Sequence, residues 1–514
     1  MIRKACDIKL YVRPVLSGVE HKYFYEGPCR FGKGEELEVG FDRIVNSLRY
    51  NGFMETIKGR MPENVELLEP LNIKRTDDWE DSEQVFEDFR KATIDADAVF
   101  IFSSLGIDDI TVELAERFDI PILLNPTSAF SPQSIFAAVK AKDPDREIYA
   151  PLHWTEAKEI LAALRARKVI RNTNILLATR FNSDVSKSSV DTFSNHDIVT
   201  KNLGVHFRYI NAHELLDDME LAKPEGNHTT PGRKTWNITE EELAKCERMA
   251  DELIAGADEV EISKEYLINS LKAYIAVQKR LDEKDCNGFT IPCPDICSTR
   301  RLNEMKFTFC LTHSLNMESG IPSSCEYDAD SVLSQQAIIA VSGRRPYIGN
   351  TGPIPYDRET GETVYIWGPS PEKVEELAKD NPENIFYMQH SVPHRLLRDP
   401  EKPNNYAIRH FAWQQEFGAV FRYDFDQDAG ETVTVCRFSP DGSKLFVGKG
   451  TIICGDGYEL QNCNGLVLFR VKDQEDFWKK QLFVGNHLAL VYGDYTKQLS
   501  KLAEVLGIEE LAAY

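Results

Sequence analysis

A short run over residues 98–105, apolar apart from two serines near its end, lies between stretches with helical periodicity, and this alternation limits the fold more than any other feature. Strand-like runs recur at residues 8–16, 65–73 and 121–125, and amphipathic runs lie at 41–51, 83–94 and 110–117. Strands that are apolar on both sides and separated by helices are typical of a parallel sheet covered on both faces. We therefore predict an N-terminal α/β domain over residues 1–150.

The middle of the chain repeats this alternation with longer helices. Strand patterns lie at residues 174–179 and 205–210, and helical patterns lie at 156–168, 239–255 and 263–281. Thr239 with Glu242 has the spacing of a capping box, in which each side chain bonds the other's backbone N–H. These patterns predict a central α/β domain over residues 151–395, which carries Glu326.

The last part of the chain is richer in strands. Residues 432–438 and 444–454 flank the turn Ser-Pro-Asp-Gly at 439–442, which predicts a hairpin, and further strands are expected at 466–471 and 488–492. A final helix over 496–506 should end at Gly507. The predicted fold class is α/β, with two Rossmann-like α/β domains followed by a β-rich C-terminal domain over residues 396–514, which carries His487.

Acidic residues gather in the stretch 321–330, just before an apolar helical run. Ser323 stands three residues before Glu326, so the pair has capping-box spacing and a helix should begin here. A glutamate in a first helical turn stays ionised, which suits a metal ligand and equally suits a simple helix cap. Asp328 and Asp330 place further anionic groups on the same turn, and a bound cation would relieve their repulsion.

Three more side chains are candidates to meet Glu326. Asn350 lies in residues 349–353, which read as a turn, His390 follows a predicted strand, and His487 follows Gly485 and Asn486. Each histidine alone is more often structural. Carboxylate and imidazole without thiolate suit Mn²⁺, Mg²⁺, Co²⁺ or Fe²⁺ better than structural zinc.

Composition excludes several classes of partner. A formal net charge of −22 over 514 residues disfavours nucleic acid and anionic membranes, and it fits a metal cation or a small uncharged substrate. Eleven scattered cysteines indicate reduced thiols, and the N-terminus has no signal-peptide pattern, so we expect a cytoplasmic protein. No glycine-rich phosphate loop follows a predicted strand, which argues against a nucleotide cofactor.

Four stretches together carry a family resemblance. They are Val-Arg-Pro-Val at 12–15, Ser-Cys-Glu-Tyr-Asp at 324–328, Thr-Val-Cys-Arg at 434–437 and the run from Asn486 to Asp494. In their order and spacing the chain resembles the L-fucose isomerase and L-arabinose isomerase superfamily, and more closely its fucose isomerase-like branch. The resemblance spans most of the chain and includes the order of its three predicted domains.

The resemblance implies a Mn²⁺-dependent aldose–ketose isomerase that acts on a free monosaccharide through an enediolate and assembles as a homo-oligomer, a hexamer or a trimer. In that family a glutamate, an aspartate and a histidine hold the metal, and the acids also move the proton. Glu326 matches the glutamate, His487 the histidine, and His390 a further ligand of the arabinose isomerases. The aspartate is missing, because Asn350 stands 24 residues after Glu326, where the family pattern places it.

That departure leaves the proton carrier open. An amide can coordinate a metal weakly through its oxygen, but it cannot act as a base at neutral pH. Asp328 or Asp357 could replace the missing acid, or Glu326 could be both ligand and base.

Further side chains are candidate substrate contacts. The resemblance adds Arg13, Arg437 and Asn486, although Arg13 could equally be a salt-bridged arginine at a strand end. Trp413 could stack on a sugar face, although such a residue is more often core. Two other functions remain open, namely carbon–carbon cleavage or elimination on a modified sugar, and sugar binding without catalysis.

Overall fold

The computed structural model describes residues 2–20, 39–76, 82–103, 108–126, 131–180, 193–227, 236–297, 300–357, 359–363, 368–412 and 415–514. The chain divides into two compact units. One contains Ile8–Arg165, and the other contains Met1–Asp7 with Ala166–Tyr514. Trp413 lies outside the described residues. Among the described helices, none combines the length and the apolar composition that crossing a membrane requires.

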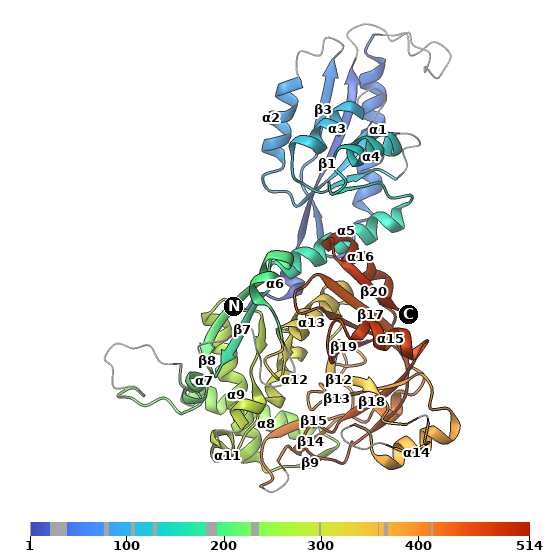
Figure 1. The fold of residues 1–514 in the computed structure, drawn as a ribbon. Helices are drawn as coiled ribbons and strands as arrows, with labels where there is room; N and C mark the ends of the chain where they lie inside the picture. The colour runs from blue at the N-terminus through green and yellow to red at the C-terminus, as the bar shows by residue number, and fades with distance from the viewer. Residues whose placement is uncertain are drawn as a thin grey trace. The chain divides into compact units, whose positions relative to one another are not determined.

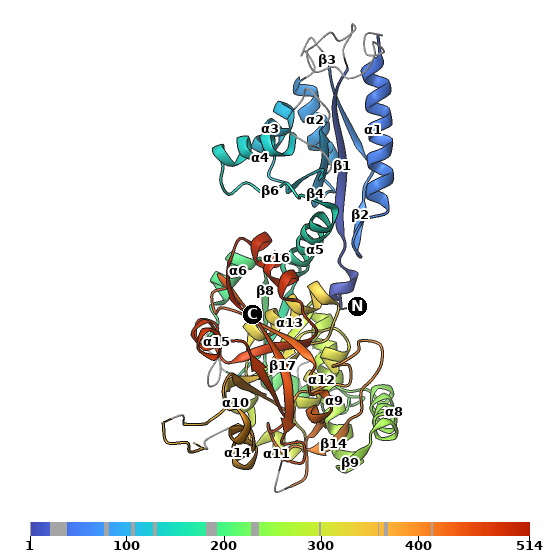
Figure 2. The same cartoon turned by 90° about the vertical axis from the view of Figure 1, so that its right-hand side faces the viewer.

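The unit Ile8–Arg165 is built on one parallel sheet with the order β2-β1-β4-β5-β6, in which β3 also pairs with β1. Its strands are β1 (Leu10–Glu20), β2 (Val65–Leu67), β3 (Leu71–Thr76), β4 (Ala98–Ser103), β5 (Ile122–Leu124) and β6 (Ile148–Tyr149). Its helices include α1 (Phe41–Lys58), α2 (Ser82–Ala92), α3 (Asp108–Arg117) and α4 (Ser131–Lys142). Figures 1 and 2 show α1 on one side of this sheet and α2, α3 and α4 on the other. The parallel sheet predicted from the strand–helix alternation is confirmed.

The second unit begins with another parallel sheet, ordered β11-β10-β7-β8. Its strands are β7 (Asn174–Thr179), β8 (His206–Asn211), β10 (Gly288–Thr290) and β11 (Ser323–Ser324). Around it lie α5 (Trp154–Arg171, which spans the division between units), α6 (His196–Leu203), α7 (Ala212–Asp218), α9 (Lys264–Glu283), α10 (Cys293–Cys297), α11 (Arg301–Met305), α12 (Cys310–Glu318) and α13 (Ala329–Ser342). Helix α8 (Glu240–Gly256) pairs with α9 beside a small sheet of β9 (Glu259–Glu261), β14 (Ala407–His410) and β15 (Ala419–Arg422). The capping box predicted for Thr239 and Glu242 is present at the start of α8.

The same unit contains an antiparallel sheet that closes on itself. Its order is β16-β19-β12-β13-β18-β17, and β17 pairs back to β16, so the strands form a barrel, with β20 added parallel to β17. The strands are β12 (Tyr347–Pro353), β13 (Ile385–Gln389), β16 (Thr432–Phe438), β17 (Lys444–Asp456), β18 (Leu466–Val471), β19 (His487–Tyr492) and β20 (Glu509–Ala513). Helices α14 (Pro371–Asp380), α15 (Gln474–Gln481) and α16 (Thr496–Leu506) accompany it, and Gly507 caps α16 in the left-handed conformation as predicted. The hairpin predicted at 432–454 is β16 and β17.

Helix α13 joins the parallel sheet to the barrel. It is buried on every face from Ala329 to Ala340, its polar side chains included, which is typical of a helix with protein on every side. It packs against β10 and β11 and also against β16 and β19. Its N-terminus therefore lies where the carboxyl ends of β10 and β11 meet the barrel.

Two local predictions are wrong. Residues 349–353 do not form a turn but belong to β12, where a Cβ on Gly349 would meet Met388 and Gln389 of the neighbouring strand, so this glycine permits a close strand approach. Ser323 and Glu326 do not form a capping box. Ser323 belongs to β11, and α13 begins at Ala329 with Asp328 as its N-cap, whose side chain accepts the N–H of Ser331 at 2.8 Å.

We predicted a central domain over 151–395 and a C-terminal domain over 396–514, and one compact unit holds residues 166–514 from both. The reason is that β12 and β13 pair with β19 and β18 from the end of the chain.

Candidate metal centre

The loop between β11 and α13 carries the central acid of the site. Glu326 and Tyr327 both have a φ of 62°, a left-handed conformation that side-chain-bearing residues seldom adopt. The loop is held because Tyr327 donates its backbone N–H to the carbonyl of Ile291 at 3.1 Å and Asp328 donates its own to Cys325 at 3.2 Å. Such backbone strain persists where the surroundings enforce it, and it is concentrated at functional sites.

Glu326, His390 and His487 meet at this loop. Their ligand atoms all lie within 4.8 Å of one another, and within the described part of the chain they are the one group of this kind that could hold a metal ion. His487 Nε2 lies 3.3 Å from Glu326 Oε2, and His390 Nε2 lies 3.7 Å from Oε1. Both rings are buried, and neither Nε2 makes a hydrogen bond of normal geometry. Two buried nitrogens without such a bond, aimed at one carboxylate, fit a site for a cation.

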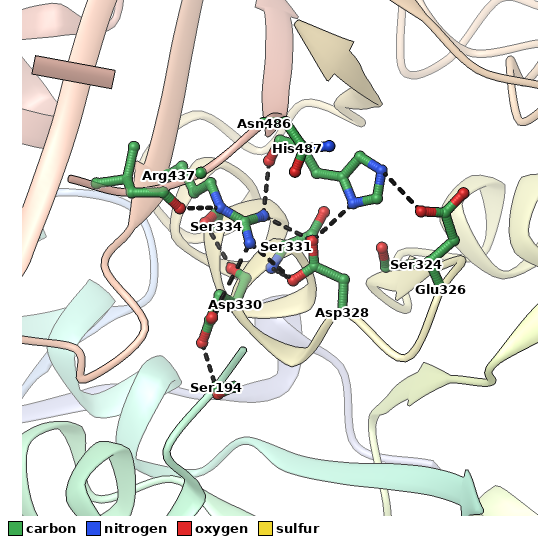
Figure 3. Close-up of polar contacts among 12 residues, drawn as sticks. Ser194, Ser324, Glu326, Asp328, Asp330, Ser331, Ser334, Arg437, Asn486 and His487 are labelled. Atoms are coloured by element: carbon green, nitrogen blue, oxygen red, sulfur yellow. Dashed lines mark hydrogen bonds and ion pairs between the residues drawn. The ribbon is translucent and has the colours of Figure 1, made fainter. Parts of the chain in front are cut away.

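His487 is oriented by a carboxylate behind it. Its Nδ1 lies 2.8 Å from Asp328 Oδ2, so in the neutral ring the proton is on Nδ1 and the Nε2 lone pair faces Glu326. Figure 3 shows the His487 ring between Asp328 and Glu326. A carboxylate–histidine pair of this kind is the usual support of a metal-bound imidazole.

Asp328 is in turn held by Arg437. The guanidinium donates to both carboxylate oxygens, Nη1 to Oδ2 at 2.7 Å and Nη2 to Oδ1 at 3.1 Å (Figure 3). Arg437 also donates to the carbonyl of His487 at 2.7 Å and to that of Val484. Arg437 and Asp328 are both buried. The two parallel hydrogen bonds of the guanidinium fix the position of the Asp328 carboxylate and, through it, the ring of His487.

His390 is held differently. Its Nδ1 accepts the backbone N–H of Ser391 at 3.0 Å, which places the proton of the neutral ring on Nε2. Tyr347 donates its hydroxyl to the carbonyl of His390 at 3.0 Å and fixes the backbone. In this tautomer His390 presents an N–H to Glu326 or to a bound oxygen, whereas the neutral form of His487 presents a lone pair.

The groups of the site keep one another charged: the Glu326 carboxyl stays ionised and the His487 ring stays protonated. Burial alone would raise the pKa of Glu326, but contacts with His390 and His487 hold it far below its usual range. Burial would lower the pKa of His487, but Asp328 and Glu326 together raise it to about 10. Without a metal, a protonated His487 therefore supplies the positive charge between the two carboxylates.

Asp330 is a second buried acid on the far side of Arg437. Burial raises the pKa of Asp330, while Arg437, with Nη2 3.9 Å from Oδ2, opposes this shift. Ser194 donates its hydroxyl to the other oxygen, Oδ1, at 2.8 Å (Figure 3). Asp330 thus belongs to the support of Arg437 and does not face Glu326.

The barrel places two predicted amides beside His487. Asn350 lies directly opposite His487 in the β12–β19 register, so the two side chains share a face of the sheet. Asn486 precedes β19 and donates its amide to the Asn350 oxygen. The oxygen that would coordinate a metal is therefore already engaged by Asn486.

Two other predicted residues bond to partners outside the three-residue cluster. Asp357 accepts the backbone N–H groups of Glu359 and Thr360, and these bonds account for its lowered pKa and its role in a turn. Arg13 lies in the unit Ile8–Arg165, where it donates to Asp95 at 2.7 Å and to two backbone carbonyls.

Two supporting residues could not be found by sequence reasoning. Ser194 stands 136 positions before Asp330 in the sequence, and no motif connects them. Tyr347 precedes the predicted turn at 349–353, and no motif connects it with His390. The structural role of Arg437 was also missed, because its motif suggested a substrate contact, whereas its guanidinium is buried behind Asp328.

Comparison with protein-family models and with curated proteins finds no match to this chain.

Proposed function

We propose that this protein is a divalent-metal-dependent aldose–ketose isomerase acting on a free monosaccharide. The observation that carries the proposal is the approach of two buried imidazole Nε2 atoms to the Glu326 carboxylate, with His487 backed by Asp328. The order of motifs, which resembles the fucose isomerase-like branch of the L-fucose and L-arabinose isomerases, supports the same activity.

The residues present fit a metal ion such as Mn²⁺. Glu326 supplies an ionised oxygen and His487 an oriented nitrogen, a donor set that suits Mn²⁺, Mg²⁺ or Co²⁺. His390 would join them as a ligand only once the Ser391 N–H no longer holds its Nδ1 lone pair. A bound cation would acidify the C–H beside the sugar carbonyl and stabilise negative charge on the enediolate.

The chain's own groups would then share the proton transfer. Glu326 is the acid whose carboxylate faces both imidazoles, so it is the candidate to take the proton from one carbon and return it to the next. Asp328 is unsuited to that role, because Arg437, Ser331 and His487 occupy its oxygens in a fully buried position. With its Nε2–H, His390 would donate a hydrogen bond to a substrate oxygen.

A second function is favoured by one observation. At position 350, where the resembled family has an aspartate, this chain has an amide engaged by Asn486, and Asp328 and Asp357 are both held by other partners. A site with Glu326 as its one candidate acid suits carbon–carbon cleavage or elimination through the same enediolate, in which the proton is not returned to a neighbouring carbon.

Metal analysis beside a panel of aldoses tests the proposal. The wild type should contain stoichiometric metal and convert an aldose to a ketose of equal mass, whereas Glu326→Gln should lose both properties. Asp357→Asn is the matched control and should keep them, because that carboxylate only caps a turn. Turnover that survives removal of metal with EDTA would refute metal dependence, and fragments of the sugar would favour the second function.

A further inference from the structure

A cluster of cysteines adjoins the candidate metal centre. It consists of five residues that interact electrostatically and come from separate parts of the chain: Cys293, Cys297, Cys310, Cys325 and Cys463. Cys325 directly precedes Glu326, and Cys463 interacts with Glu326. None of these thiols has a role in the proposed isomerisation.

We propose that Cys293 and Cys325 are a disulfide-forming pair that a peroxide oxidises. The two residues follow the neighbouring parallel strands β10 and β11, which pair as Phe289 with Ser323 and Thr290 with Ser324. Their thiols are close enough to share a hydrogen bond.

The backbone also holds the two segments together. Thr290 donates its hydroxyl to the carbonyl of Cys325 at 3.5 Å, and Tyr327 donates its N–H to the carbonyl of Ile291 at 3.1 Å. A disulfide needs Cβ atoms about 3.5–4.5 Å apart. The two bonds keep the chain around Cys325 beside the chain that leads from β10 to Cys293, as a cross-link between these neighbouring segments requires.

Other uses of the cluster fit the geometry less well. Cys293 and Cys297 lie four residues apart on α10, where Cβ atoms are about 5–6 Å apart, so this pair is too wide for a disulfide. In the described part of the chain, the one group with three ligand atoms within 4.8 Å is Glu326, His390 and His487. The thiols are therefore too dispersed to hold one metal ion together, whereas a disulfide requires only two of them.

A small oxidant can reach the pair from one side. Cys293 is partly exposed, while Cys325 is buried. Cys297, one helical turn from Cys293, lines a cavity of about 330 Å³ together with Asn303, Thr308 and Asn462. Cys293 is accordingly the thiol that meets the peroxide first, and Cys325 resolves it.

The chemistry balances with hydrogen peroxide as the oxidant. The Cys293 sulfur attacks one peroxide oxygen, the O–O bond breaks, and Cys293 becomes a sulfenic acid while one water forms. The Cys325 sulfur then attacks the Cys293 sulfur, the S–O bond breaks, and the hydroxide leaves with the Cys325 proton as a second water. Two thiols are oxidised to one disulfide, and one peroxide is reduced to two waters.

The bond would act on the metal centre through one residue. Glu326 follows Cys325 in a left-handed backbone conformation, so a shift of Cys325 re-aims the carboxylate relative to His487. This consequence rests on the proposed function. Oxidised protein should bind Mn²⁺ at least about tenfold more weakly than reduced protein. Disturbing the groups that orient a metal ligand typically has an effect of this size.

Peptide mapping of the full-length protein after treatment with hydrogen peroxide tests the pair without reference to activity. The expected product is a cross-linked Cys293–Cys325 peptide, lighter by two hydrogen atoms than its parts, which dithiothreitol separates again. Cys293→Ser and Cys325→Ser should each abolish it, and the exposed control Cys6→Ser should not. A different cysteine pair, or sulfinic acid at Cys293 without a cross-link, would overturn the proposal.

Mn²⁺ titration of the same samples is the second readout. Weaker binding in oxidised wild type, restored by dithiothreitol and absent in Cys293→Ser, is the expected result. A cross-link that leaves Mn²⁺ affinity unchanged would refute the coupling to Glu326. Reduced protein that binds no Mn²⁺ would refute the proposed function, while the peptide map would still decide the disulfide.

Discussion

His487 Nδ1 and Asp328 Oδ2 lie 2.8 Å apart in a fully buried contact. The contact joins the first residue of β19 to the N-cap of α13, two elements that the sequence places 159 residues apart. It sets the tautomer of His487, so the chemistry of the candidate site depends on a residue that does not itself face the ligand position.

Asp328→Asn should weaken metal binding while Glu326 and His487 remain. An amide can present either oxygen or N–H₂ to Nδ1, so the ring loses its fixed tautomer and the charge that makes it a better donor. We expect Mn²⁺ affinity to fall about 10–100-fold, the usual cost of losing such a support. Isothermal titration measures it. Asp357→Asn should leave the affinity unchanged, and a loss of equal size in that variant would contradict the assignment.

Arg437→Met should lower the free energy of unfolding strongly, because Arg437 supports the metal centre without being one of its ligands. It leaves the buried Asp328 carboxylate without its cation, and removing one partner of a buried ion pair costs about 3–5 kcal/mol. Urea unfolding measures the loss. Adding Asp328→Asn removes the orphaned charge and should recover part of the stability. If the free energy of unfolding lost in the double variant equals the sum of the losses in the two single variants, Arg437 and Asp328 are not energetically coupled.

The stability of metal-free protein should depend on pH through His487. In the folded protein its pKa is raised from 6.5 to about 10, so the folded state binds this proton more tightly than the unfolded chain does. The stabilisation is therefore fully present below pH 6.5 and is lost as the pH rises through about 10. The difference in Tm between wild type and His487→Gln, measured in EDTA, should shrink across that window. A constant difference would mean that His487 is not charged in the metal-free fold.

Helices and strands with a clear hydrophobic periodicity were predictable from the sequence. Strands β7 and β18 and helix α16 match their predicted bounds, because each is a regular apolar pattern between turn or capping residues. β12 was misread because Gly349, Gly352 and Pro353 resemble turn residues. In the structure Gly349 instead permits close contact with β13, a requirement set by the neighbouring strand rather than by local sequence.

The site was predictable only in part, for a similar reason. The stretch around Glu326 stood out by its acid content, but Ser323 and Glu326 suggested a cap that tertiary structure overrides. Pairing of β11 with β10 takes Ser323 into a sheet, and Asp328 becomes the cap instead. The partnership of Asp328 with Arg437 and His487 depends on how the barrel packs against α13, and no local pattern encodes such packing.

Asn350→Asp tests whether the amide at this position limits the site. The new carboxylate would lie opposite His487 in the register of β12 and β19, and Asn486 could still donate to it, so the fold should be kept. An added anionic ligand raises the affinity for a hard cation, and we expect Mn²⁺ to bind about tenfold more tightly. A second acid near the carbon should also increase ketose formation relative to any cleavage product. Asn350→Ala is the matched control, because it removes the amide without supplying an acid. If both variants bind Mn²⁺ like the wild type, position 350 takes no part in the metal centre.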